Sequence, residues 1–319
     1  MMKRVISLLL AALLFASLLP VALADATPRP ITTVDYDSLP DDSANGIHYY
    51  LLLCQDLYVD KVTPEGYPAG NTDGIVLVTL NTRAHRVMLT SIIRDALIVR
   101  PDGVIGRINY IPKNYGPEAL CRIISTHLGV KVEKYILFNF SHIQNIIDSL
   151  GGVDITISSA EAGYLKRYPV SPTATSPTIS GAGTYHFTGH AAMIYMRIRK
   201  AGGGGDFMRT QRVRTVLSTL ADQCRNITYD DARTLLDTVI ANSSMTNMSL
   251  EEMLEAMDYA YSLRGCTIEE LRIPQDDAVS AITYAGMAVQ EVDWEKSRED
   301  MADFLQNSYL VIDDEDNDW

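Results

Sequence analysis

Apolar residues fall into short, closely spaced runs over the first third of the chain. The segments 47–54 (IHYYLLLC), 74–81 (GIVLVTLN) and 85–93 (HRVMLTSII) are rich in β-branched, aromatic and other apolar residues, and polar residues separate them. Runs of this length and composition are typical of buried strands. We therefore predict a strand at 47–54 and a buried hairpin at 74–93.

Helical and strand patterns alternate in the next part of the chain. Residues 117–128 have helical spacing and end at Gly129, whereas 135–140 and 153–157 have the composition of strands. Ser141 and Gln144 form a capping box for a helix that ends at Leu150. The order strand, helix, strand, helix, strand favours an α/β fold with a layered sheet.

The remaining segments are less regular. Residues 158–184 are rich in Ser, Pro, Thr and Gly, which predicts a surface loop. Ser249 and Glu252 form a second capping box. The other predicted helices lie at 189–198, 206–224, 230–240, 249–263 and 294–307, and short strands lie near 268–273 and 286–292.

The two ends of the chain differ from its body. Lys3 and Arg4 precede an apolar run, and Pro20 is followed by Ala22-Leu23-Ala24, which is typical of an export signal over residues 1–24. The alternative is an uncleaved membrane anchor. Residues 25–45 read as a linker and 310–319 as an acidic tail, so 46–309 is predicted to be one domain. Both interpretations of the N-terminus place that domain outside the cytoplasm.

The charge balance narrows the class of partner. The chain has 319 residues, 47% of them apolar, and a formal net charge of −13 at pH 7. General nucleic-acid binding requires broad positive potential, so we expect no nucleic-acid partner and no DNA-binding regulator. An acidic chain also makes any local group of basic residues more informative.

The four cysteines are widely spaced and indicate neither a small disulfide framework nor a zinc site. Three pairings are open to them. We expect Cys54 and Cys121 to be buried thiols, because both lie in apolar patterns.

Five arginines gather between residues 195 and 214, around a run of glycines. Asp206 lies where a helix N-cap belongs, and Arg209 and Arg212 follow on the same helical face. Helix N-termini favour anions, and guanidinium groups match phosphate oxygens. Arg197 and Arg199 approach from the preceding segment, whereas Arg214 falls off the shared face and is predicted to be solvated. A solvated surface helix capped by Asp206 is the alternative.

Charged residues also stand at the predicted strand ends. Arg94 and Asp95 follow one buried strand, Asp56 follows the first, and Asp73 precedes the second. Two carboxylates at neighbouring strand ends, together with substrate phosphate, suit Mg²⁺. Ordinary turn residues are the alternative for each acid taken alone.

Five segments in order resemble the LytR-CpsA-Psr family over about residues 48–222. They are "TDGIVLVTLN…VMLTSIIRDALI", "GRINYIPKNYG", "YILFNFSHIQNIIDSLGGVDI", "FTGHAAMIYMRIR" and "GDFMRTQRVR". The resemblance implies an extracytoplasmic α/β/α domain with a central mixed sheet. It also implies a phosphotransferase that moves a glycopolymer, such as teichoic acid or capsule, from a polyprenyl-pyrophosphate carrier at the membrane surface to peptidoglycan.

The resemblance also assigns roles to residues. It implies Asp56 and Asp73 as ligands of a Mg²⁺ cofactor. Catalytic roles fall to Arg94, Asp95, Arg197, Arg199 and Asp206, and substrate-binding roles to Arg107, Asn109, Arg209, Gln211 and Arg212.

The chain departs from the family pattern near the first strand. Tyr58 and Asn71 stand where the family has arginines, and Ile93 replaces a proline. A pyrophosphate-binding or regulatory module and a pyrophosphatase that uses water are therefore alternatives to the transferase. Under all of these interpretations we expect Arg197 and Arg212 to bind ligand and not to support the fold.

Overall fold

The computed structural model describes residues 26–167, 178–201 and 205–306, without the side chain of Asp206. The expected export signal at 1–24, the acidic tail at 310–319 and three of the four glycines of the predicted hinge lie outside the described residues. In the described part of the chain, no helix is both long and apolar enough to cross a membrane.

A six-stranded mixed sheet forms the centre of the fold, with strand order β10-β3-β2-β1-β6-β9. β1 pairs in parallel with β6, and β3 pairs in parallel with β10, whereas the other neighbours are antiparallel. The strands span Ile47–Gln55 (β1), Thr72–Asn81 (β2), Arg86–Ile92 (β3), Lys134–Phe138 (β6), Met245–Thr246 (β9) and Ile268–Ile273 (β10). The predicted strand and hairpin at 47–93 are confirmed.

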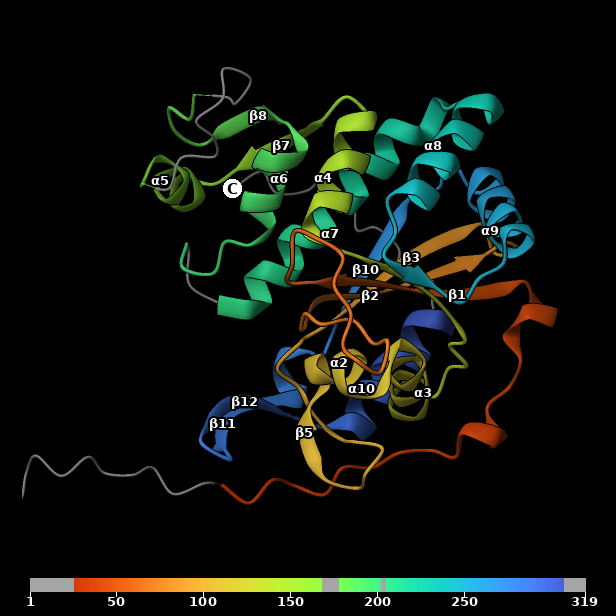
Figure 1. Cartoon of the computed structure of the whole chain (residues 1–319), viewed down its shortest axis with the longest axis vertical. Helices are drawn as coiled ribbons and strands as arrows, with labels where there is room; N and C mark the ends of the chain where they lie inside the picture. Colours follow the sequence, from red (N-terminus) through yellow and green to blue (C-terminus); the bar gives the residue numbers. More distant parts are fainter. Residues whose placement is uncertain (1–25, 168–177, 202–204, 307–319) are drawn as a thin grey trace, which may run out of the picture.

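Both faces of the sheet are covered by helices, which gives three α/β/α layers (Figure 1). One face carries α2 (Ile111–Tyr115), α3 (Pro117–Leu128) and α10 (Trp294–Gln306). The other face carries α4 (Phe140–Ser149), α7 (Gly205–Gln223), α8 (Tyr229–Ala241) and α9 (Leu250–Ser262). The predicted α/β/α class with a mixed sheet is confirmed.

Strand β1 shows why an almost continuous apolar run suits this position. Leu51 and Leu53 are buried in the main core with α3 and α10, whereas Leu52 and Cys54 point to the opposite face. There they line an apolar cavity under α4 and α7. Because successive side chains of a strand alternate between faces, a strand covered on both sides needs apolar residues at every position.

Three small antiparallel pairs extend the layers, and of their six strands only β7 and β12 were predicted. They are β4 (Leu97–Val99) with β5 (Ile105–Arg107), β7 (Val153–Ile157) with β8 (Gly183–Phe187), and β11 (Val279–Tyr284) with β12 (Met287–Val292). The predicted loop at 158–184 instead begins with helix α5 (Ser159–Arg167) and ends in β8. α6 (Gly189–Met196) then packs against α4 and α7.

The helix caps agree only in part with the sequence signals. The Ser249–Glu252 capping box is confirmed at the start of α9. The predicted Ser141–Gln144 box is wrong, because α4 begins at Phe140 and the Asn139 side chain accepts from the His142 N–H. Helix α7 begins at Gly205, so Asp206 lies inside its first turn and not at the N-cap.

The segment predicted as a linker lies against the body of the protein. Val34 donates to the backbone carbonyl of Thr126 at 2.9 Å, and the segment contains two 3₁₀ turns, Tyr36–Ser38 and Asp42–Asn45. Arg29 pairs with Glu291 at 3.1 Å. These contacts cross to α3 and to the β11–β12 pair.

Candidate functional site

Charged segments meet at one edge of the central sheet. β1, β3 and β6 run in the same direction, because β2 is antiparallel to both β1 and β3, and β6 is parallel to β1. The carboxyl ends of β1 and β3 therefore lie at the same edge as the amino end of β2. Asp56, Asp73 and Arg94 are positioned by these three strand ends.

Asp73 lies at the centre of the charged site. Its Oδ1 accepts a hydrogen bond from Arg94, and its Oδ2 lies 3.2 Å from Nη1 of Arg209 and 3.5 Å from Nη2 of Arg199. Arg209 also donates to the backbone carbonyl of Asp73 at 2.8 Å. One carboxylate therefore gathers three guanidinium groups, and their combined charge remains positive.

Arg197 extends this group towards solvent. It is the C-cap residue of α6 and is exposed. Its Nη1 donates to the hydroxyl of Tyr58 at 3.3 Å, and its guanidinium carbon lies 4.5 Å from the ring centroid of Phe140. We call Arg94, Arg197, Arg199 and Arg209, with Asp73, the arginine cluster.

A row of ion pairs continues from Arg94 to Asp95 and Arg107. Asp95 lies 3.6 Å from Nε of Arg94 and 3.3 Å from Nη1 of Arg107. Asn109 donates its backbone N–H to the Arg94 carbonyl at 3.2 Å. Its side chain is buried, and Oδ1 has no hydrogen-bond partner among the described residues. A buried acceptor of this kind is costly unless a water or ligand donates to it.

Arg212 lies beside the cluster but is buried, against the expectation that it faces the ligand. Its Nε donates to Glu161 at 2.6 Å, and its two Nη atoms donate to the carbonyls of Ile198 and Ala201 at 2.8 and 3.1 Å. All three nitrogens are therefore used inside the protein. Arg212 holds the segment that carries Arg197 and Arg199. Sequence reasoning missed Glu161, whose only local signal is a capping box with Ser158.

Arg214 is also buried, so the prediction that it is solvated is wrong. Its Nε lies 2.9 Å from Glu270 of β10, and its Nη1 donates to Ser91 of β3. Burial lowers the pKa of the Arg214 guanidinium. The side chain fastens α7 to the sheet, because this side of the helix faces β3 and β10 and not water.

One further predicted residue, Gln211, is not brought into the cluster. Gln211 lies on α7 with an exposed side chain. The side chain of Asp206 lies outside what the structure describes.

An apolar cavity of about 310 Å³ opens beside the arginine cluster. Asp73, Arg197 and Arg209 are among its lining residues, and the rest of its wall is apolar. That wall comes from β1, β2, β6, α4, α6, α7 and α8, and includes Leu52, Val76, Phe138, Phe140, Ile147, Met193 and Val216.

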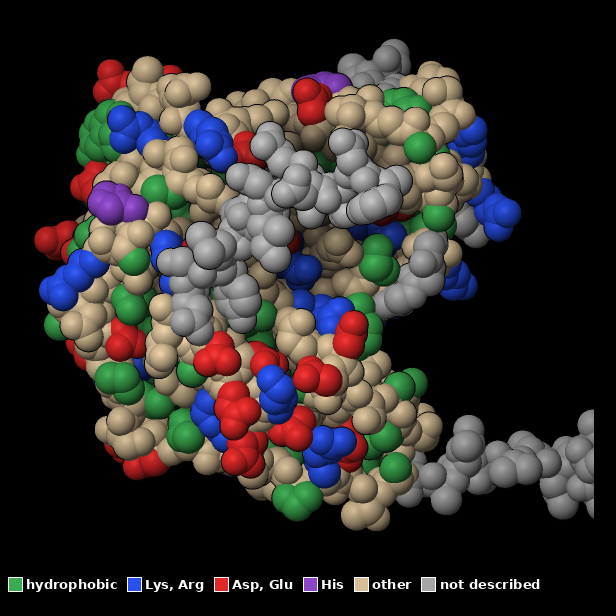
Figure 2. All heavy atoms as spheres, turned by 180° about the vertical axis from the view of Figure 1, so that it is seen from behind, with side chains coloured by type: hydrophobic (Ala, Val, Ile, Leu, Met, Phe, Trp, Pro, Cys, Tyr) green, Lys and Arg blue, Asp and Glu red, His purple; other side chains and the backbone are tan. Residues whose placement is uncertain are grey.

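A second apolar cavity of about 470 Å³ continues from the first. Leu217 and Leu220 of α7 line both cavities, as do Leu52 and Ile136 of the sheet. Seen from behind, the surface is hollowed near mid-height, and basic side chains lie in that hollow (Figure 2).

Asp56 and Asp73 are the two carboxylates that the sequence resemblance implies as ligands of a Mg²⁺ ion. Asp56 Oδ1 accepts from the Asn71 N–H at 2.8 Å, so Asp56 is held against the segment that leads into Asp73. Burial and then the charge of Asp73 raise the pKa of the Cys54 thiol to about 12. The Oγ1 atom of Thr72, next to Asp73, is buried without a partner among the described residues. No described group of three His, Cys, Asp or Glu side chains forms a complete metal site. Mg²⁺ commonly uses one or two carboxylates and completes its shell with phosphate and water.

Curated relatives resemble the chain at low identity. TagT of Bacillus subtilis (strain 168), a polyisoprenyl-teichoic acid–peptidoglycan teichoic acid transferase, is 25% identical over 217 residues, covering 67% of this chain and 64% of TagT. A TagU of Bacillus mycoides (strain KBAB4) is 25% identical, covering 66% of each chain. Biofilm regulatory protein A of Streptococcus mutans is 21% identical, covering 64% of this chain and 51% of that protein. The chain spans between half and two thirds of the length of these relatives.

Solved structures share the fold. A structure of TagT bound to LI-WTA superposes with a TM-score of 0.66 at 22% identity, covering 89% of this chain and 97% of TagT. B. subtilis TagV superposes with a TM-score of 0.63 at 21% identity, covering 83% of this chain and 99% of TagV. The LytR_cpsA_psr family profile matches residues 34–301, which include the whole arginine cluster. The chain belongs to the LytR_cpsA_psr family.

Proposed function

We propose that the chain is an extracytoplasmic phosphotransferase that moves a glycopolymer from a polyprenyl-pyrophosphate carrier to peptidoglycan. The observation that carries the proposal is the position of the arginine cluster beside the apolar cavity, with Arg197 and Arg209 belonging to both. A lipid pyrophosphate likewise has an anionic part, which would match the arginine cluster, joined to a long apolar part, which would match the cavity. The names of TagT and TagU as teichoic acid transferases support the same class of reaction.

The arginine cluster would bind the pyrophosphate. Guanidinium groups bind phosphate oxygens with two parallel hydrogen bonds and stay charged, so they stabilise the negative charge that develops during phosphoryl transfer. Arg199 is the best placed of the four, because its side chain is 46% exposed and holds Asp73 only at 3.5 Å. Asp56 and Asp73 would hold the Mg²⁺, which supplies further charge neutralisation at the phosphates when bound.

The reaction joins the acceptor to the glycan-side phosphate. A hydroxyl of the acceptor sugar attacks the glycan-side phosphorus, the bond from that phosphorus to the bridging oxygen breaks, and polyprenyl phosphate leaves with the bonding pair. The hydroxyl proton passes to a base or to water. Asp95 bridges Arg94 and Arg107 and thereby orients both guanidinium groups. The product is a phosphodiester between glycan and peptidoglycan.

The proposal places the chain at the outer face of the cytoplasmic membrane, secreted or anchored there. The polyprenyl carrier resides in that membrane and the acceptor lies outside it. The apolar cavities support this placement, because they are suited to an extracted lipid chain.

The neutral residues Tyr58 and Asn71 favour one competing function, a module that binds the lipid pyrophosphate without transferring it. A reaction of purified protein with a lipid-pyrophosphate glycan, Mg²⁺ and a peptidoglycan oligomer separates the alternatives. The proposal predicts a new phosphodiester in the mass spectrum of the oligomer. Binding without that product indicates the module, and release of lipid phosphate without acceptor indicates a pyrophosphatase.

A further inference from the structure

Tyr58 is an aromatic side chain exposed beside the arginine cluster. It follows β1 by three residues and is 46% exposed. Its ring packs edge-to-face on Phe140 with centroids 5.2 Å apart, and its hydroxyl accepts a hydrogen bond from Arg197 at 3.3 Å. In the described part of the chain the hydroxyl hydrogen has no acceptor, so it is available to donate to a ligand.

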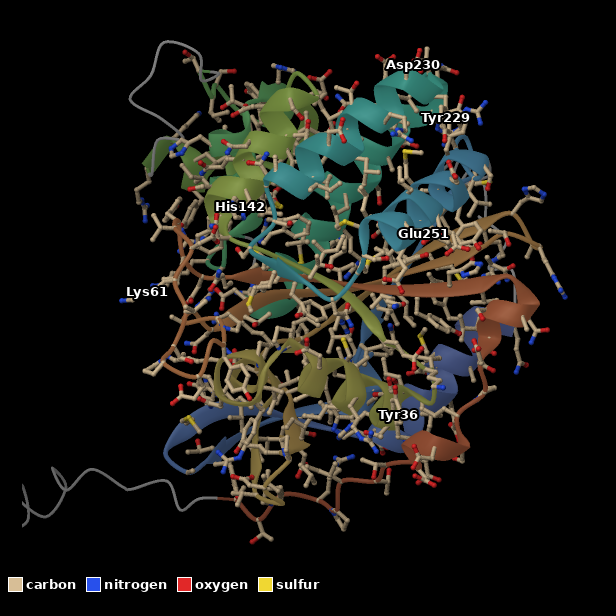
Figure 3. All side chains as sticks on the ribbon, turned by 45° about the vertical axis from the view of Figure 1, so that its right-hand side comes forward. Tyr36, Lys61, His142, Tyr229, Asp230 and Glu251 are labelled. Atoms are coloured by element: carbon tan, nitrogen blue, oxygen red, sulfur yellow. The ribbon has the colours of Figure 1, made fainter. Side chains whose placement is uncertain are left out.

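The segment that carries Tyr58 is fixed to the start of α4. The Leu57 carbonyl accepts from the Phe140 N–H at 2.8 Å, and the Tyr58 carbonyl accepts from Ser141 Oγ at 2.6 Å. Two residues on, Asp60 accepts from the Asn139 side chain at 3.0 Å. The backbone of this segment is therefore fixed to the start of α4, and the Tyr58 ring that it carries stays partly exposed. Lys61 of the same segment projects away from the body (Figure 3).

The cavity, the arginine cluster and Tyr58 follow one another in space. Phe140 and Arg197 line the cavity, whereas Tyr58 contacts both residues without lining it. A lipid chain in the cavity with its pyrophosphate on the arginine cluster would present the next group of the ligand near Tyr58. In a lipid-linked glycan, and in the acceptor that attacks it, that group is a sugar ring.

We propose that Tyr58 stacks on a pyranose ring bound next to the pyrophosphate and so determines which sugar the site accepts. This inference rests on the proposed function and adds a sugar-binding residue to it. A rigid tyrosine provides a large contact area at little conformational cost and a polar hydrogen-bonding tip. A phenol carries no positive charge, so at this position it favours a neutral ring over a further phosphate.

The test compares two lipid ligands that differ only in the sugar. Affinities of the full chain for polyprenyl pyrophosphate and for polyprenyl-pyrophosphate-linked N-acetylglucosamine are measured for wild type and for Tyr58→Ala. Loss of the ring is expected to weaken binding of the sugar-bearing ligand about tenfold relative to the bare ligand. Tyr58→Phe keeps the ring and is expected to retain most of the preference.

Tyr229→Ala is the matched control. Tyr229 is 43% exposed and lies at the start of α8, on the opposite side of the molecule from Lys61 (Figure 3). Its replacement is expected to leave both affinities unchanged. A thermal melt of each variant shows that the exposed substitutions leave the fold intact.

A second arm distinguishes donor sugar from acceptor sugar. If Tyr58→Ala leaves both lipid affinities unchanged but raises the KM for a peptidoglycan oligomer about tenfold, the stacked ring belongs to the acceptor. The inference is overturned if neither quantity changes, or if both lipid ligands weaken equally, since Tyr58 then acts only through Arg197. Wild-type protein that binds neither lipid overturns the proposed function itself.

Discussion

At the scale of single residues, the arginines of this site divide by burial into two groups. Arg212 has a side chain only 2% exposed and holds the protein together, whereas Arg199 is 46% exposed and holds Asp73 at only 3.5 Å. A buried guanidinium whose nitrogens all have protein partners has little capacity left for a ligand. The exposed guanidiniums retain that capacity.

Arg199→Ala and Arg212→Ala are therefore expected to fail in different ways. Arg212→Ala leaves Glu161 as a buried charge without its partner and frees two backbone carbonyls, which should cost about 3–5 kcal/mol in the free energy of unfolding. Arg199→Ala removes an exposed ion pair and should cost less than about 1 kcal/mol. Urea denaturation measures both.

Arg199→Ala, the variant with the smaller loss of stability, should show a clear loss of affinity for ligand. Folded Arg199→Ala is expected to bind polyprenyl pyrophosphate at least about tenfold more weakly, because a charge-assisted contact is lost. Equal stability losses in the two variants would contradict the division of the arginines by burial.

Sequence reasoning recognised the arginines but not their burial. The helical period correctly places Arg209 and Arg212 on related faces of α7. The period does not reveal that α7 is enclosed by α5, α6 and the sheet. Because of this enclosure, the face of α7 that carries Arg214 packs on the sheet, and Arg214 binds Glu270 and Ser91. Residue spacing specifies a face of a helix, whereas the packing partner of that face depends on contacts distant in sequence.

At the scale of elements, the contact between α3 and α10 contains a titratable group. His127 of α3 is buried, packs edge-to-face on Trp294 with ring centroids 4.6 Å apart, and its Nδ1 lies 2.7 Å from the Ile123 carbonyl. Burial lowers the pKa of His127 to about 4. The imidazole is therefore neutral in the folded protein at pH values at which it is charged in the unfolded chain.

The sign of the resulting pH dependence follows from linkage. Between pH 6.5 and pH 4 the unfolded state binds more protons at His127, so stability falls as pH falls through this window. The expected loss from this group between pH 7 and pH 5 is about 2 kcal/mol.

His127→Gln, which cannot titrate, should lose correspondingly less stability between the same two pH values. Urea denaturation of wild type and variant at pH 7 and pH 5 isolates the difference, because all other groups titrate in both proteins. Equal losses would show that His127 is not held neutral by the α3–α10 contact.

Much of the order of helices and strands could be predicted from the sequence, because strongly apolar strands and well-capped helices carry local signals. The β1 strand, the β2–β3 hairpin and the capping box of α9 are of this kind. The β9 pairing and helix α5 were missed, since β9 is only two residues long and the Ser/Thr/Gly-rich composition around α5 resembles a loop. These elements form because the surrounding layers supply their partners.

At the scale of the whole molecule, the two connected cavities are the feature that the layers create together. They lie between the sheet and the layer of α4, α7, α8 and α9, and Leu217 of α7 lines both. Leu217→Trp is expected to narrow the passage between them. Binding of a long polyprenyl pyrophosphate should weaken about tenfold or more, because the apolar contacts beyond Leu217 are lost.

A short ligand provides the comparison. Geranyl pyrophosphate needs only the first cavity, so its affinity should stay within about threefold of wild type, a difference below 1 kcal/mol. Leu217→Ala, which widens the passage, is the control at the same position. If Leu217→Trp weakens both ligands equally, the second cavity takes no part in binding the chain.

We propose that the arginine cluster and the apolar cavities form one site for a polyprenyl pyrophosphate. A crystal structure of the protein with a polyprenyl pyrophosphate and Mg²⁺ tests it most directly. We expect density for the pyrophosphate within hydrogen-bonding distance of Arg197 and Arg199, with the lipid chain running past Met193 and Leu217. Density for the pyrophosphate away from these arginines, or for the lipid chain outside the cavities, would contradict it.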